Sequence, residues 1–425
     1  MKKNKARLVV KTYPNGLQTV VRHMPGFNSV STNIRVGIGS SDEAEHEQGL
    51  SHLVEHLLFD TKNRTSAENK DFLGNYGAEL NAFTNHHSTS FTTLGLKSNF
   101  DTCNEVLSDM FSKPNINKQN LLREQMVIAR EIADGMHDSA PQSSVEAAYG
   151  HFNAGTPYAR KIVGPPDAVH QFNAGDVKSY RRRHYVAPNI VMGFAGDVTS
   201  ERVDKMVEEL WLPYFGNAKA KPKLTNNSAD MLAPTPKFIP VENISGQHNA
   251  TILMPTPNML SDERFPLRIA NDIFHRNLFN TVRERLGLVY GIASSLMLRP
   301  VNGNIEIGFS CAPQDTERVM QAISEEIERF KNGDLSSQEV QRAKNVVKSR
   351  LLYRSEDTVG TNRTNVDTLA YYNGIRSHEE LLDMYDSIGV TDVQDVADRY
   401  MNPKKATVAV AGKSAGRIKS NEFGI

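Results

Sequence analysis

The sequence predicts an α+β fold of two homologous α/β-layered domains, in which antiparallel-rich sheets pack against helices. Strand-like and helix-like stretches alternate along the chain, which is typical of layered domains. A Pro-, Lys- and Asn-rich segment divides the 425 residues almost in half. The two halves also repeat one pattern, which indicates an internal duplication. A chain of this length is too long for a single hydrophobic core, so two domains are expected.

The first half begins with short strand-like runs and continues with amphipathic helices. Alternating apolar residues predict strands at 8–11, 17–22 and 31–36. From Gly49 the apolar spacing becomes helical, with Leu50 and Leu57 among the residues on one face. Further along we expect a strand pair at 80–83 and 90–96, helices near 99–112 and 117–136, and a buried strand at 190–196.

The linker is predicted at 217–237, where runs such as Asn-Ala-Lys-Ala-Lys-Pro and Ala-Pro-Thr-Pro-Lys favour an extended, solvated chain. This places an N-terminal domain at 1–216 and a C-terminal domain at 238–425. Two like domains joined by a linker can face one another across a cleft.

The duplication rests on one matched pair of segments. Asp176 begins a predicted helix that leads to a strand ending at Gly196, and Asp392 begins a similar helix that leads to a strand ending at Gly412. The distance from Asp to Gly is 20 positions in both copies, and the copies are 216 positions apart. Because few other identities support the match, we expect from it only that the two halves share a fold.

Composition excludes several classes of protein. Lys+Arg and Asp+Glu both number 49, so the balanced charge argues against nucleic-acid binding as the main function. No apolar run approaches 18 residues, so no membrane span is expected. Cys103 and Cys311 are too few for a disulfide framework. Strand-like alternation starts almost at once and leaves no room for a signal peptide, so we expect a cytoplasmic protein.

The strongest chemical signal is the run His52-Leu53-Val54-Glu55-His56. Side chains four apart lie one above the other on a helix, so the two imidazoles can bind one metal ion. Glu55 then lies beside the metal, where a base can take a proton from water. With 13 His in the chain, chance predicts on the order of 0.03 such matches. The alternative is an amphipathic helix with two surface histidines.

Catalytic zinc usually takes a third protein ligand, and the run from 121 to 131 offers two candidates. Glu124 and Glu131 are seven residues apart and share a helix face. One could bind the metal while the other accepts a hydrogen bond from a ligand histidine. Spacing alone does not choose between them, and such Glu pairs often face solvent.

The histidine pair together with these two glutamates resembles the pitrilysin/insulysin family of inverzincin zinc metallopeptidases, in its short two-domain branch with mitochondrial processing peptidase and bacterial homologues. The resemblance implies one Zn²⁺ per chain, bound by His52, His56 and Glu131. It implies Glu55 as the general base and Glu124 as the partner of a ligand histidine. After the predicted zinc helix this chain carries Asp60, where relatives often have glycine.

Two further segments are similar to substrate-binding elements of the family. In the first half, Asn81, Ala82 and Phe83 match an edge strand that pairs with the extended substrate, although an ordinary hairpin strand would fit equally well. In the second half, Arg283 and Tyr290 match an element that holds a substrate carbonyl and stabilises the oxyanion. Taken alone, that segment would be a helix end that leads into a core strand.

These observations predict a zinc endopeptidase that cleaves unfolded peptides or protein segments bound as an added β-strand. The alternative is a non-catalytic peptide-binding or partner subunit of the same fold. A third hypothesis is a zinc hydrolase for non-peptide amides. In relatives of this length two subunits face each other, so we expect a homodimer, with a heterodimer containing a metal-free homologue as the alternative. No nucleic-acid or membrane partner is expected.

Overall fold

The computed structural model describes residues 7–135, 139–216, 235–372 and 374–418. These residues form two compact units, and each unit draws on both halves of the sequence. The first contains the described parts of 1–136, 160–225 and 353–375, and the second contains those of 137–159, 226–352 and 376–425. Of the predicted linker 217–237, residues 217–234 lie outside the described residues, and Lys237 is the first residue of a strand.

The first unit is built on a six-stranded mixed sheet with the order β1-β2-β6-β3-β5-β4. Only the β2–β6 pair is parallel among its ladders. Its strands are β1 (Arg7–Thr12), β2 (Gln18–His23), β3 (Ser29–Val36), β4 (Glu79–Thr84), β5 (Thr89–Leu96) and β6 (Ile190–Gly196). Its helices are α1 (Leu50–Leu58), α2 (Ser66–Gly74), α3 (Phe100–Ser112), α4 (Lys118–Gly135), α6 (Ala174–His184), α7 (Ser200–Met206), α8 (Leu212–Phe215) and α12 (Thr358–Tyr372).

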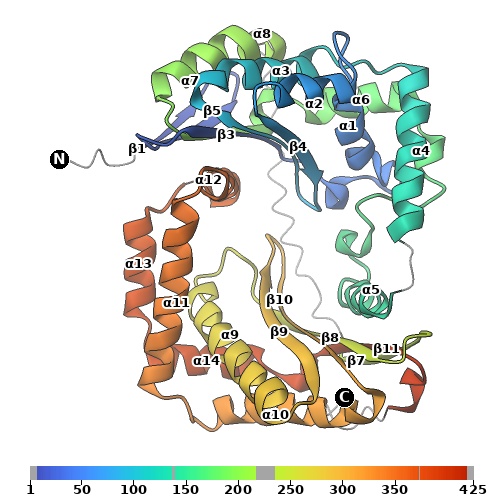
Figure 1. Ribbon diagram of the computed structural model, residues 1–425, viewed down its shortest axis with the longest axis vertical. Helices are drawn as coiled ribbons and strands as arrows, with labels where there is room; N and C mark the ends of the chain where they lie inside the picture. The colour runs from blue at the N-terminus through green and yellow to red at the C-terminus, as the bar shows by residue number, and fades with distance from the viewer. Residues whose placement is uncertain (1–6, 136–138, 217–234, 373, 419–425) are drawn as a thin grey trace. The chain divides into compact units, whose positions relative to one another are not determined.

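The two faces of this sheet are covered by different helices. On β6, Met192 and Phe194 point into the main core with α1, α3 and α6, while Val191 points to the opposite face and packs against Val366 of α12. Figure 1 shows α12 on the face of the sheet that lies away from α3. The period-2 alternation of the strand therefore gives a buried strand two apolar faces.

Helix α12 reaches this sheet from the second half of the sequence and docks closely. The Asn362 side chain donates hydrogen bonds to the backbone oxygens of Ser31 (2.8 Å) and Gly193 (3.0 Å). A Cβ atom at Gly193 would lie 2.1 Å from Asn362 Oδ1, so the glycine makes this approach possible. The buried Arg35 donates to the Tyr371 hydroxyl at 2.7 Å.

The second unit is built on a five-stranded sheet with the order β7-β11-β8-β10-β9, in which β7–β11 is parallel and the other pairs are antiparallel. Its strands are β7 (Lys237–Glu242), β8 (His248–Thr256), β9 (Val289–Leu298), β10 (Gly303–Cys311) and β11 (Thr407–Gly412). Its helices are α5 (Ala140–Phe152), α9 (Arg264–Leu278), α10 (Thr316–Lys331), α11 (Ser337–Ser355), α13 (His378–Ser387) and α14 (Val390–Tyr400).

The two sheets share one topology, since β7-β11-β8-β10-β9 repeats the order and directions of β2-β6-β3-β5-β4. At the start of each matched helix an aspartate side chain accepts a hydrogen bond from the N-cap backbone N–H: Asp176 accepts from Asn173 at 2.9 Å in α6, and Asp392 accepts from Gly389 at 2.7 Å in α14. The strands that follow end at Gly196 and Gly412, both with positive φ. The predicted fold, two α/β-layered domains with helices packed on mixed sheets, is confirmed.

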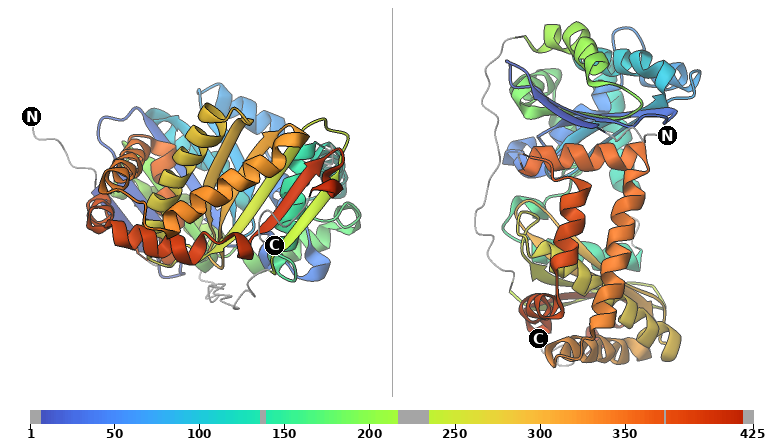
Figure 2. Two further views of the ribbon diagram at one scale, coloured as in Figure 1. Left: turned by 90° about the horizontal axis from the view of Figure 1, so that it is seen from below. Right: turned by 90° about the vertical axis from the view of Figure 1, so that its left-hand side faces the viewer.

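Helix α5 of the first half packs on the second sheet, as α12 of the second half packs on the first. Ala148 and Phe152 of α5 contact Leu253 of β8 and Ala409 of β11. The alternate residues of these two strands point into the core made with α9, α10 and α14. Figure 2 (left) looks onto this helical side, with α10, in orange, in front of the sheet.

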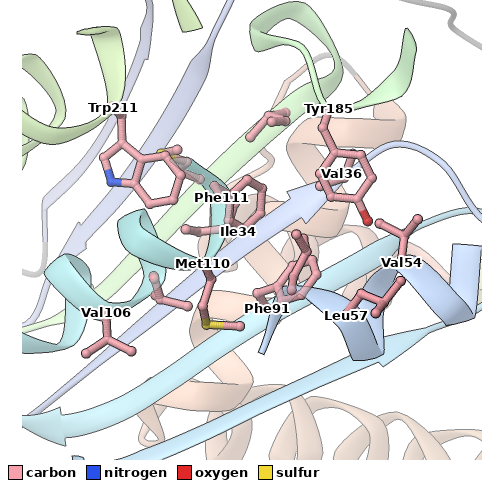
Figure 3. Close-up of a cluster of buried hydrophobic side chains, with 14 of the residues drawn as sticks. Ile34, Val36, Val54, Leu57, Phe91, Val106, Met110, Phe111, Tyr185 and Trp211 are labelled. Carbon is pink, nitrogen blue, oxygen red and sulfur yellow. The ribbon is translucent and has the colours of Figure 1, made fainter. Parts of the chain in front are cut away.

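An aromatic cluster forms the centre of the first unit's core (Figure 3). The ring of Phe111 lies 5.1 Å from that of Phe91 and 5.2 Å from that of Trp211, both in edge-on geometry. Val54 and Leu57 of α1 pack beside this cluster and are fully buried. Burial of these two side chains fixes the rotation of α1, and so fixes which side chains occupy its other face.

Candidate metal centre

Helix α1 is held at its N-terminus by a buried carboxylate. Glu43 accepts hydrogen bonds from the backbone N–H groups of Gly49 (2.8 Å) and Ser51 (2.6 Å), which satisfies two donors at the start of the helix. Gly49 has φ 93°, and a Cβ atom there would lie 2.8 Å from the Val163 carbonyl oxygen. The start of the helix is therefore fixed by both backbone geometry and the two hydrogen bonds to Glu43.

His52 and His56 share the remaining face of α1 and converge with Glu131 of α4. Their ring centroids are 4.6 Å apart. Glu131 Oε2 lies 3.9 Å from His52 Nε2 and 3.7 Å from His56 Nε2. Among the described residues, this trio is the group of His, Cys, Asp or Glu whose potential ligand atoms all lie within 4.8 Å of one another.

The donor set suits zinc. Two imidazole nitrogens and one carboxylate oxygen are ligands that catalytic zinc commonly takes. Tetrahedral bonds of about 2.0–2.1 Å would place the donors about 3.4 Å apart, so the two distances from Glu131 Oε2 to the imidazole nitrogens, 3.7 and 3.9 Å, need to shorten only slightly. Burial lowers the pKa of His52 to about 4, with a further contribution from the His56 charge, so this imidazole is neutral and available as a ligand.

Glu124 lies behind His56, on the side away from Glu131. Its Oε2 accepts a hydrogen bond from His56 Nδ1 at 3.1 Å, which leaves His56 Nε2 free to face Glu131. Burial alone would lower the pKa of His56, but the hydrogen bond to Glu124 and the charges of Glu131 and Glu55 raise it. His52 differs, because its buried Nδ1 has no hydrogen-bond partner among the described residues.

Glu55 is a buried carboxylate directed by strand β4. The Thr84 hydroxyl donates a 2.6 Å hydrogen bond to Glu55 Oε2. Burial raises the pKa of Glu55, and this hydrogen bond partly opposes the shift. A buried carboxyl with a raised pKa beside two imidazoles has the character of a group that can both accept and donate a proton.

The three predicted substrate-binding residues of the first half lie on β4, which stands at the end of the sheet order. The Asn81 side chain accepts a hydrogen bond from its neighbour, the backbone N–H of Ala82, at 2.9 Å. Phe83 points to the α12 face, where the Arg363 guanidinium lies 5.6 Å from its ring. An edge strand is the element that pairs with an added peptide.

Arg283 and Tyr290 belong to the second unit. Arg283 lies in the wide helical turn Phe279–Arg285 that follows α9, with its guanidinium 4.9 Å from the Phe279 ring. Tyr290 lies on β9, the end strand of the second sheet, and is 86% exposed. Strand β9 thus holds in the second sheet the position that β4 holds in the first. Tyr290 lies on this end strand, whereas Arg283 lies in the helical turn that precedes it.

Two profiles of one protein family match this chain. The profile described as "Insulinase (Peptidase family M16)" matches residues 18–166, and that described as "Peptidase M16 inactive domain" matches residues 171–347. The chain belongs to the insulinase family of peptidases. The first match includes α1, α4 and β4, so all the candidate metal ligands of this insulinase-family chain lie within it.

Relatives of the insulinase-family chain cover nearly all of its length. An uncharacterised zinc protease of Mycobacterium leprae is 26% identical over 422 residues, covering 96% of this chain and 92% of the relative. An uncharacterised zinc protease of Bacillus subtilis is 23% identical over 414 residues, with 94% and 97% coverage. A protease from Helicobacter pylori has the same fold, with a TM-score of 0.84, 18% identity and coverage of 96% and 100%. Complex III2 from Candida albicans includes a chain with a TM-score of 0.83, 16% identity and coverage of 98% and 99%.

Three further residues near the centre, Thr84, Asp60 and Arg123, have no role assigned to them from the sequence of this insulinase-family chain. The sequence could have indicated Thr84, because it is two positions from Ala82 and therefore lies on the same face of the strand. Asp60 and Arg123 form an ion pair beside Glu124, and no sequence spacing predicts that contact.

Every helix in the described part of the chain falls short of the length and apolar character that a membrane span requires.

Proposed function

We propose that this protein is a zinc-dependent endopeptidase that hydrolyses peptide bonds of unfolded peptides or protein segments. The observation that carries the proposal is the convergence of His52, His56 and Glu131 within 4.8 Å of one another, with the buried Glu55 next to His56 in the chain. The family and the naming of its relatives as zinc proteases support the same conclusion.

Zinc held by His52, His56 and Glu131 supplies Lewis acidity toward the scissile carbonyl and increases the acidity of water. Glu55 is the group that takes the proton from water and delivers it to the leaving amine. Thr84 occupies one oxygen of this carboxylate, Oε2, so the other oxygen is the one available for proton transfer. Glu124 keeps the proton of His56 on Nδ1, on the side away from the reaction.

The substrate is proposed to bind as an added strand along β4. An extended peptide gains affinity from backbone hydrogen bonds, with little demand on its sequence. Asn81, Ala82 and Phe83 would contact it there. Because a folded protein cannot offer an extended free strand, unfolded segments are the expected substrates. Arg283 and Tyr290 are proposed to hold the substrate carbonyl and the oxyanion, in the same chain or in a second copy.

The experiment compares wild type with Glu55→Gln in two assays: metal content after dialysis and cleavage of an unstructured peptide, read by mass spectrometry. We expect one zinc per chain in both proteins, and a loss of turnover of about 10²- to 10⁴-fold in the variant. A chelator should abolish cleavage, and added zinc should restore it. A variant that cleaves as fast as wild type would contradict the assignment of Glu55. A zinc-bound wild type with no cleavage of any peptide in a library would favour the non-catalytic partner subunit.

A further inference from the structure

A chain of polar contacts leads from His56 away from the candidate metal centre. Glu124 accepts a hydrogen bond from His56 Nδ1 on Oε2 and another from Arg123 Nε on Oε1, at 3.1 and 3.0 Å. Arg123 Nη2 is paired with Oδ2 of Asp60. Asp60 Oδ1 in turn accepts a 2.8 Å hydrogen bond from the Ser66 N–H at the start of α2. Both oxygens of each carboxylate are therefore occupied.

Burial of the two carboxylates restricts the movement of the side chains in this series of contacts. Asp60 is 1% exposed and Glu124 is 8% exposed, whereas Arg123 lies half-exposed between them. A buried carboxylate is costly unless it is paired, so Asp60 confines the Arg123 guanidinium to one place. The planar fork of arginine can contact both carboxylates at once, with Nε toward one and Nη2 toward the other.

This chain of contacts has no counterpart at the other histidine. The buried Nδ1 of His52 has no hydrogen-bond partner among the described residues. Of the two histidines, His56 is therefore the one whose ring is oriented by a residue outside the proposed ligand set. Without Arg123, the Glu124 carboxylate would keep only its contact with His56 and could rotate. The position of Asp60, two residues after the end of α1, ties this support directly to the helix that carries both histidines.

We propose that Asp60, acting through Arg123, is a positioning residue that fixes Glu124 against His56 and thereby increases the affinity of the site for zinc. The inference rests on the proposed zinc site. Partners outside the ligand set commonly contribute 10- to 100-fold to metal affinity, and we expect roughly 3- to 10-fold from this more distant pair.

The test is a zinc titration in competition with a chromophoric chelator, using wild type, Asp60→Asn, Arg123→Met and the double variant. Asparagine can still accept from Ser66 N–H but cannot form the ion pair, so it separates the proposed role from support of α2. Each single variant should weaken zinc binding roughly 3- to 10-fold. The double variant should bind zinc no more weakly than the weaker-binding single variant, because both substitutions remove the same contact. The visible spectrum of the Co²⁺-loaded protein should shift in the same variants.

Asp109→Asn is the matched control, because Asp109 pairs with Lys113 and accepts from Asn63 near the same loop without reaching Glu124. It should bind zinc within about twofold of wild type. The inference is overturned if Arg123→Met and Asp60→Asn bind zinc as tightly as this control, or if their effects add fully in the double variant. If wild type itself binds no zinc, the proposed function fails first and this inference falls with it. Arg123→Met changes a half-exposed side chain, so the test remains decisive if Asp60→Asn does not fold.

Discussion

Thr84 and Glu55 are joined by a 2.6 Å hydrogen bond, in which the threonine hydroxyl donates to Glu55 Oε2. The bond connects the edge strand β4, where the substrate is proposed to bind, with the proposed general base on α1. A shift of β4 would therefore also move the carboxylate, so the strand and the base are positioned together.

Replacing Thr84 with valine should reduce kcat by roughly tenfold and leave KM and zinc content nearly unchanged, because the base loses a charge-assisted hydrogen bond but keeps its place on α1. Steady-state kinetics on an unstructured peptide measure the effect. Thr84→Ser keeps the hydroxyl and should retain most of the activity. Equal kcat in the valine variant and wild type would remove Thr84 from the mechanism.

The two glutamates of α4 should respond differently to substitution. Glu131→Gln removes a proposed ligand, so zinc should be lost on dialysis. Glu124→Gln keeps all three ligands and should weaken zinc binding about 10- to 100-fold. Glu105→Gln, an exposed change on α3, serves as the control. Zinc titration of the three variants measures the order, and a Glu124 variant that binds more weakly than the Glu131 variant would reverse the assignment.

The close approach of α12 to the first sheet predicts a large stability effect at one glycine. Gly193→Ala would place a Cβ atom 2.1 Å from Asn362 Oδ1 and from Val366 Cγ2. The helix must then move, and we expect unfolding free energy to fall by about 1–3 kcal/mol. Urea denaturation measures it. Gly150→Ala on α5, where a Cβ atom meets nothing within 4 Å, should be neutral or stabilise by up to about 1 kcal/mol.

Both cysteines should be unreactive in the folded protein. Burial raises the pKa of Cys103 to about 11 and also raises that of Cys311. A raised thiol pKa means less thiolate at a given pH, so alkylation at pH 8 should be slow and should accelerate about tenfold per pH unit up to the pKa. Mass spectrometry after iodoacetamide treatment should find both thiols labelled only in denaturant. Rapid labelling of the native protein at pH 8 would be inconsistent with this burial.

Local patterns in the sequence predict the elements around the candidate centre well. Helices expected near 99–112 and 117–136 form α3 (Phe100–Ser112) and α4 (Lys118–Gly135), because their apolar faces are strongly periodic. The exchange of α5 and α12 between the sheets could not be predicted. The apolar residues of α5, such as Ala148 and Phe152, indicate that one face is buried, but they do not specify which sheet covers it.

The candidate site, like the fold, could be predicted from the sequence only in part. Helical spacing predicts that His52 and His56 converge, because four residues make about one turn. The same spacing leaves Glu124 and Glu131 equivalent, and only tertiary packing places one against Nδ1 and the other near both Nε2 atoms. Contacts such as Asp60 with Arg123 join residues 63 positions apart and follow from how α1 lies against α4.

The most direct measurement is anomalous diffraction at the zinc absorption edge from crystals of the zinc-loaded protein. The account predicts one zinc peak per chain, at about 2.0–2.2 Å from His52 Nε2, His56 Nε2 and a carboxylate oxygen of Glu131. A peak bound by other residues, or a zinc ion at the two imidazoles with Glu131 turned away and no other ligand in its place, would contradict it.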